Sequence, residues 1–186
     1  AALVSPYLLA TIGTVFLIGT AYSVPPLRLK RFPFFAAASI TLARAIVFHC
    51  GMYLTYVHKL TGEASIPASV WGFTGFMFLF VVVIAMMKDV PDIEGDRKHN
   101  ISTFVANLGS RKVMTLCRYI LSVAYLGMIT AALAGLEGVS VPVCVASHSL
   151  ALSALWYKAI GCDDESPKEA YAYYMLIWSL LYFEFV

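Results

Sequence analysis

Long apolar runs alternate along this chain with short polar segments. Six runs approach or exceed the ~20 apolar residues needed to cross a bilayer, at residues 2–22, 33–56, 66–87, 113–135, 139–160 and 170 to the end. The runs are continuous and lack the strict alternation of barrel strands. Because only helices or closed barrels satisfy their backbone in lipid, the pattern predicts an all-α, polytopic membrane bundle of about six transmembrane helices.

The composition agrees with a membrane protein. Hydrophobic residues make up 60% of the 186 positions and charged residues only 13%, whereas a soluble domain carries about 25% charge. The net charge of +2 is too small to indicate nucleic acid binding. The four cysteines are far apart and form no CxxC pair, so we interpret them as buried apolar residues. The chain starts without Met inside an apolar run and stops within another, so we expect a fragment of a longer protein.

The distribution of positive charge predicts the topology. Ten of the 13 Lys and Arg residues lie in or beside the first, third and fifth polar segments: Arg28, Lys30, Arg31, Lys88, Arg97, Lys98, Arg111, Lys112, Lys158 and Lys168. The second and fourth segments contain only Lys59. By the positive-inside rule, the first set faces the cytoplasm or stroma.

One polar segment, residues 88–98, concentrates four acids and three bases directly after an apolar run. We call it the acidic segment. Asp89, Asp92 and Asp96 would share one helical face at i, i+3 and i+7, although Pro91 and Gly95 argue against a regular helix. Crowded carboxylates need a positive partner, and Mg²⁺ takes one or two of them together with substrate phosphate oxygens. The pattern favours a Mg²⁺–diphosphate site; a solvated loop remains the alternative, and the spacing does not fit an EF-hand.

Basic residues on the same predicted side could complete such a site. Arg28, Lys30 and Arg31 follow the first run, and their side chains can hold diphosphate oxygens and stabilise a leaving group. The alternative is that they only set the topology. Tyr22, at the end of the first run, is otherwise an interfacial aromatic.

Two arginines lie inside apolar runs. Arg44 is near the middle of the second run, where a charge costs at least ~2.5 kcal/mol. We therefore expect Arg44 to face the bundle interior or a wet cavity, either in a substrate pocket or paired with Glu184. Arg118 is close to the start of its run, and we expect it to snorkel to the interface. The four histidines are dispersed, and we interpret them as solitary polar residues.

These motifs resemble a known family. Asp89-x-x-Asp92-x-x-x-Asp96 after an apolar helix, followed by Ile-Ser-Thr-Phe at 101–104 and Leu-Gly at 108–109, resembles the second aspartate-rich motif of the UbiA superfamily of intramembrane prenyltransferases. Residues 22–33 resemble that family's Tyr…Lys-Arg loop. The sequences of both motifs are most similar to those of the plastid homogentisate prenyltransferases. Within this group they resemble the solanesyltransferase branch more than the phytyltransferase branch.

The resemblance implies a nine-helix fold of which residues 1–186 are the C-terminal part. The family's first Asn/Asp-rich motif has no match here, so we expect this fragment alone to be inactive. The resemblance implies that Asp89, Asp92 and Asp96 bind Mg²⁺ bridging a prenyl diphosphate and that Tyr22 and Lys30 are catalytic residues of the loop. The candidates for neutralising the diphosphate charge are Lys30, Arg31, Arg97 and Lys98. For the carboxylate of an aromatic acceptor, our own candidates are Arg28 and Arg44.

The implied reaction moves a polyprenyl group, solanesyl, from its diphosphate to homogentisate with loss of CO₂, in plastoquinone (prenylquinone) biosynthesis. The partners are these two substrates and the lipid bilayer of a plastid (chloroplast) membrane, with the acidic segment on the stromal side. Phytyl transfer, or transfer to chlorophyllide, 4-hydroxybenzoate or haem, remains an alternative. So does a non-catalytic transporter that uses the acids to bind ions. The oligomeric state does not follow from the sequence.

Overall fold

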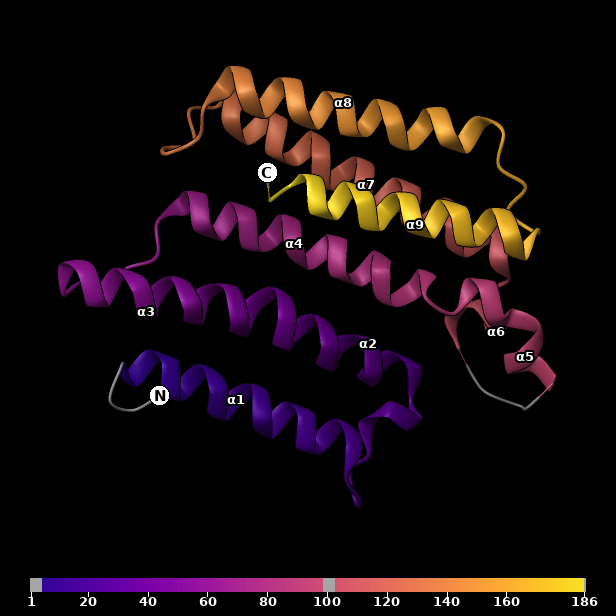
Figure 1. Cartoon of the computed structure of the whole chain (residues 1–186), viewed down its shortest axis with the longest axis horizontal. Coiled ribbons are helices and arrows are strands. Elements are labelled where there is room, and N and C mark those ends of the chain that lie inside the picture. The colour runs from indigo at the N-terminus through magenta and orange to yellow at the C-terminus, as the bar shows by residue number, and fades with distance from the viewer. Residues whose placement is uncertain (1–4, 99–102, 186) are drawn as a thin grey trace. The chain divides into compact units, whose positions relative to one another are not determined.

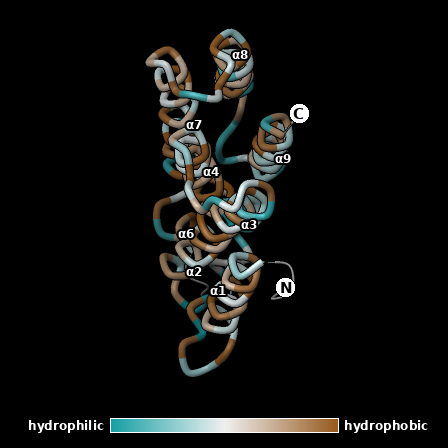
Figure 2. The backbone as a smooth tube through the Cα atoms, turned by 90° about the vertical axis from the view of Figure 1, so that its left-hand side faces the viewer, coloured by the Kyte–Doolittle hydropathy of each residue, from teal (hydrophilic) through white to brown (hydrophobic). Residues whose placement is uncertain are grey.

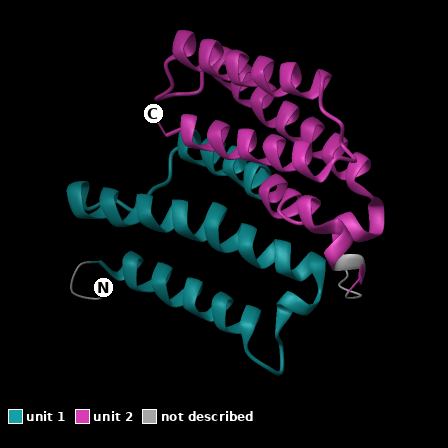
Figure 3. Cartoon of the chain, turned by 45° about the vertical axis from the view of Figure 1, so that its right-hand side comes forward, with its two compact units in different colours: residues 1–81 teal, residues 82–186 magenta. Residues whose placement is uncertain are grey.

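The computed structural model describes residues 5–98 and 103–185, except for the side chains of Asp96 and Arg97. The described chain is helical and contains no strand. It divides into two compact units, residues 1–81 and 82–186 (Figure 3). Figure 2 shows hydrophobic positions along the long helices of both units. The predicted all-α architecture is confirmed.

Unit 1 is built from α1, the continuous helical stretch formed by α2, η2 and α3, and the first part of α4. Its elements are α1 (Pro6–Ser23), the 3₁₀ turn η1 (Leu29–Arg31), α2 (Pro33–Thr41), the π-helical η2 (Leu42–Phe48), α3 (His49–Thr61) and the first part of α4 (Ala68–Met87) (Figure 1). At the start of α1, the Tyr7 N–H donates to the Ser5 hydroxyl at 3.2 Å and Pro6 occupies the first turn, both favourable helix-start signals.

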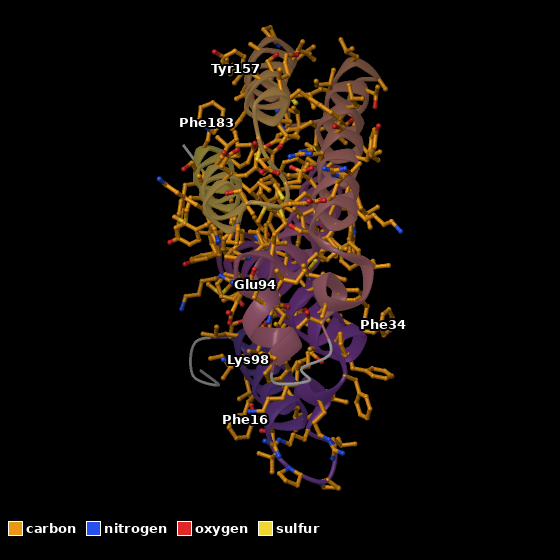
Figure 4. The ribbon with its side chains drawn as sticks, turned by 90° about the vertical axis from the view of Figure 1, so that its right-hand side faces the viewer. Phe16, Phe34, Glu94, Lys98, Tyr157 and Phe183 are labelled. Carbon is orange, nitrogen blue, oxygen red and sulfur yellow. The ribbon has the colours of Figure 1, made fainter. Side chains whose placement is uncertain are left out.

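A glycine allows α1 and α3 to approach closely. A Cβ atom added at Gly51 would collide with the side chain of Thr11, which is buried between the two helices. The outer surfaces of this unit are apolar, with Phe16 and Phe34 projecting from α1 and α2 (Figure 4). Such exposed apolar surface suits lipid contact.

Unit 2 contains the end of α4 and three further long helices. Its elements are η3 (Val90–Asp92), α5 (Ile93–Lys98), α6 (Phe104–Leu108), α7 (Ser110–Leu133), α8 (Val141–Ile160) and α9 (Pro167–Phe183) (Figure 1). The helices α7 and α8 pack together, and α9 packs on both α8 and η3. Gly135 and Gly138 have φ values of 88° and 78° in the α7–α8 turn, a left-handed conformation that glycine adopts without steric cost.

Five helical stretches of the described chain are long and apolar enough to cross a membrane: Pro6–Ser23, Pro33–Thr61, Ala68–Gly95, Ser110–Leu133 and Val141–Ile160. They correspond to the first five predicted runs. The sixth run is α9, which has 17 residues. Boundaries differ by a few residues because polar residues extend α3 to Thr61 and start α7 at Ser110.

Candidate functional site

The acidic segment leaves the membrane helix as two short turns rather than as one regular helix. After α4 ends at Met87, Pro91 lies in the three-residue η3, and α5 follows from Ile93. Val90 is buried, and α9 packs on η3, so the segment is attached to the core of unit 2. Asp89 precedes η3, and its carboxylate lies 3.6 Å from Lys88 Nζ.

Asp92 is exposed and bends back over the glycine three residues later. A Cβ atom at Gly95 would collide with Asp92 Oδ1. The absence of a side chain at Gly95 therefore allows the Asp92 carboxylate to occupy this position. Glu94 and Lys98 are also exposed on α5 (Figure 4). Farther along the motif, the Thr103 hydroxyl accepts the Ala106 N–H at 3.1 Å and so starts α6, whereas Ile101 and Ser102 lie outside the described residues.

The described donors fit a hard divalent cation. The Asp92 side chain is exposed, and that of Asp89 is 25% exposed and lies beside Lys88. Mg²⁺ uses one or two such ligands and completes its shell with water and phosphate oxygens. No group of three His, Cys, Asp or Glu side chains that could hold a metal gathers among the residues that the structure describes. The predicted third ligand, Asp96, and the predicted cation Arg97 lie outside the described side chains.

The cationic residues after α1 gather on one exposed turn of unit 1. Arg28, Lys30 and Arg31 are all exposed, and the Arg31 guanidinium lies 5.9 Å from the centre of the Phe32 ring. Arg28 has φ 38°, in the left-handed region that is uncommon for a residue other than glycine. Tyr22 is half-buried near the end of α1. The structure thus brings the basic loop residues together within unit 1.

Arg44 lies in the π-helical segment η2 of unit 1, and its side chain is exposed there. Its suggested partner Glu184 belongs to unit 2, where it lies 3.6 Å from His148 Nε2. The basic loop and Arg44 therefore belong to one unit and the acidic segment to the other.

A buried ion pair in unit 2 contradicts the expectation for Arg118. Its guanidinium donates to both carboxylate oxygens of Asp164, at 2.8 and 2.5 Å, and lies 4.7 Å from the centre of the Tyr173 ring. The two charged side chains are only 8% and 11% exposed. The Ser110 hydroxyl donates to the Asp164 carbonyl at 2.5 Å. The prediction that Arg118 snorkels was wrong because the α8–α9 connection folds back over it.

An open pocket of about 510 Å³ lies beside the α8–α9 connection, and its lining includes Lys158, Cys162 and Glu169. Partial burial, aided by the Asp164 carboxylate, raises the pKa of the Cys162 thiol above its ordinary value. This thiol is therefore kept neutral, which disfavours nucleophilic reactivity.

His148 was expected to be solitary, and that prediction was wrong. Its Nε2 atom lies 3.6 Å from Glu184 Oε2, and the Tyr125 ring packs edge-on against it at 5.7 Å. The three residues come from α8, the end of α9 and α7. No local sequence signal connects positions so far apart, so this cluster required the packing of the three helices.

Comparison with known proteins places these features in context. The model of the UbiA prenyltransferase family matches residues 1–180. Homogentisate phytyltransferase of Synechocystis sp. is 36% identical over 95% of this chain and 57% of its own length. In Arabidopsis thaliana, homogentisate phytyltransferase 1 is 37% identical over 92% of this chain and 44% of its own, and homogentisate solanesyltransferase is 36% identical over 89% and 43%. The chain thus spans about half the length of these relatives. No solved structure matches it.

Proposed function

Since the chain belongs to the UbiA prenyltransferase family, we propose that the full-length protein transfers a prenyl group from a prenyl diphosphate to homogentisate. The observation that carries this proposal is the match along nearly the whole chain to relatives named as homogentisate prenyltransferases. The identities are similar for phytyl- and solanesyltransferases. We favour solanesyl as the donor group because the sequences of residues 22–33 and 94–103 are most similar to the solanesyltransferase branch.

The acidic segment and the basic loop suit the diphosphate end of the donor. Asp89, Asp92 and Asp96 would hold Mg²⁺, which when bound neutralises charge on the diphosphate oxygens. As the carbon–oxygen bond breaks, both bonding electrons leave with the diphosphate. Cationic side chains stabilise that growing negative charge through charge-assisted hydrogen bonds. The candidates for this role are Lys30, Arg31, Arg97 and Lys98.

The remaining chemistry takes place on the apolar side of the site. The allylic cation left by the diphosphate needs shielding from water, which a helical bundle in lipid supplies. The electron-rich ring of homogentisate then forms the new carbon–carbon bond. The ring proton is released, and the carboxylate leaves as CO₂ while a proton takes its place on the remaining methylene carbon. Tyr22 is positioned at the end of α1 beside the basic loop, and Arg28 and Arg44 are our candidates for the acceptor carboxylate.

The proposed location is a plastid membrane. Five stretches of the described chain could span a bilayer, and both Arabidopsis relatives are named as chloroplastic. The positive-inside asymmetry supports a stromal position for the acidic segment and the basic loop.

The test compares Asp92→Asn with Glu94→Gln in the full-length enzyme, using radiolabelled solanesyl, phytyl or geranylgeranyl diphosphate and either homogentisate or 4-hydroxybenzoate. Removing the Asp92 charge should lower kcat by about 10²–10³-fold, as expected for lost stabilisation of a developing charge. Glu94→Gln removes another exposed charge two residues away and should leave kcat within about twofold, because such surface charges contribute little.

The outcomes separate the alternatives. Turnover of 4-hydroxybenzoate but not homogentisate would reject the proposed acceptor, and a preference for phytyl diphosphate would reject solanesyl. If the wild-type protein transfers no prenyl group to any acceptor, the enzymatic proposal fails and an ion-binding membrane protein becomes the better interpretation.

A further inference from the structure

A rare helical geometry occurs in the middle of the second membrane span. Residues Leu42–Phe48 form a π-helical segment between α2 and α3. Such segments are uncommon because they need i→i+5 hydrogen bonds, and they occur frequently at functional sites. This one contains Arg44, the only charged residue between Pro33 and Val57.

The histidine that follows the segment holds this geometry. His49 Nδ1 lies 2.8 Å from the Arg44 carbonyl oxygen and 3.1 Å from that of Ala45. Carbonyl oxygens only accept hydrogen bonds, so Nδ1 carries the proton and donates to them. The imidazole is also held between aromatic rings, edge-on to Phe48 at 6.1 Å and to Phe73 of α4 at 5.5 Å. His49 is therefore a fixed donor to the backbone of Arg44.

The Arg44 side chain lies on an exposed part of the second membrane span. Ala45 is fully buried, whereas Arg44 is exposed. In the described part of the chain, its guanidinium has no hydrogen bond, ion pair or ring contact. An unpaired charge in the middle of a membrane span costs free energy, and the planar guanidinium fits a bidentate oxyanion. The arrangement indicates an anionic ligand.

The depth of Arg44 distinguishes between the available oxyanions. It lies 11 residues after Pro33, which is about 16 Å along a helix at ~1.5 Å per residue. A diphosphate bound at the basic loop cannot bridge that distance. The two substrates bound end to end can span it. The diphosphate then lies at the basic loop, the aromatic acid contacts the reacting carbon, and the carboxylate of the acid lies next to Arg44.

We propose that Arg44 binds the carboxylate of the aromatic acceptor and that His49 is a positioning residue that fixes the direction of the Arg44 side chain. This inference rests on the proposed function. If the His49 hydrogen bond is lost, the π segment can relax to α geometry with a register shift of one residue. One residue corresponds to about 100° of rotation around the helix, which turns Arg44 away from its ligand.

The test uses steady-state kinetics of the full-length enzyme with both substrates varied. Arg44→Met should raise KM for homogentisate by about 10–100-fold, since a hydrogen bond to a charged group contributes roughly 1.5–3 kcal/mol. KM for the prenyl diphosphate should stay within about twofold. Competitive inhibition by methylhydroquinone, which resembles homogentisate without its carboxylate, should not change.

The positioning role is tested with two amides of similar polarity. The amide nitrogen of Asn can occupy the place of Nδ1, whereas that of Gln corresponds to Nε2. His49→Asn should therefore keep KM for homogentisate within about threefold of wild type, while His49→Gln should raise it toward the Arg44→Met value. Equal kinetics of the two amide variants would overturn the positioning role of His49.

Other outcomes identify another ligand. An Arg44→Met effect confined to KM for the prenyl diphosphate would assign Arg44 to the donor. An effect confined to thermal stability that depends on added anionic lipid would assign it to a lipid headgroup. Either outcome would overturn the carboxylate proposal. Absence of any turnover by wild type would instead refute the proposed function, and equilibrium binding of homogentisate to wild type and Arg44→Met would then still test the carboxylate contact.

Discussion

Neutralising Asp164 should destabilise unit 2 strongly. Asp164→Asn preserves the size of the side chain but removes the charge that receives two hydrogen bonds from Arg118, at 2.8 and 2.5 Å. Arg118 would then remain as a buried cation, with the Tyr173 ring as its main partner. Breaking a buried pair by removal of one partner typically costs about 3–5 kcal/mol. We expect a loss in the free energy of unfolding within that range, toward its lower end because cation–π attraction retains about 0.5–2 kcal/mol.

A double-mutant cycle isolates the interaction. Arg118→Met and Asp164→Asn should each destabilise the protein, and their combination should cost less than the sum, with a coupling energy of about 2–3 kcal/mol. The neighbouring pair of Arg111 and Glu165 is the matched control. Its atoms are 3.5 Å apart but its side chains are 71% and 67% exposed, so its coupling should be below about 1 kcal/mol.

The measurement is the unfolding of the full-length protein in mixed micelles of increasing denaturing detergent, followed by tryptophan fluorescence. Coupling energies that are equal for the two pairs would refute the reasoning, as would a cost below about 1 kcal/mol for Asp164→Asn. Either result would mean that water screens the Arg118 pair despite its low exposure.

Two further predictions concern packing and thiol chemistry. Gly51→Ala should destabilise the protein by about 1–3 kcal/mol because the new Cβ would collide with Thr11. Gly127→Ala is the control and should not destabilise the protein, because the space around Gly127 is open. Equal effects of the two substitutions in the same unfolding assay would contradict this packing. Burial and the Asp164 carboxylate raise the pKa of Cys162, so its alkylation by a neutral maleimide should require a higher pH than that of a free thiol. Asp164→Asn should move the midpoint to lower pH, and an unchanged midpoint would exclude the carboxylate as a cause.

Much of the fold could be predicted because lipid imposes a simple rule. A chain crossing hydrocarbon must satisfy its backbone within each segment, so the apolar runs at residues 33–56 and 66–87 already indicated helices. Pro91 and Gly95 indicated that the acidic segment would be broken, and it consists of η3 and α5. In these cases the decisive interaction is local along the chain.

The features that sequence reasoning missed depend on contacts between distant residues. Arg118 looked like an interfacial side chain, but its partner Asp164 comes 46 positions later and approaches only when the α8–α9 connection folds back. The π geometry around Arg44 has no sequence pattern of its own, and His49, which donates to the Arg44 carbonyl, packs against Phe73 of another helix.

The apolar runs and the charges between them thus establish that this chain is a membrane helical protein and where its candidate chemistry lies along the chain. The partners of its buried charges and the direction of Arg44 depend on how the helices pack. Burial makes a charge costly wherever it lies, and only the neighbour that tertiary packing supplies determines how that cost is offset.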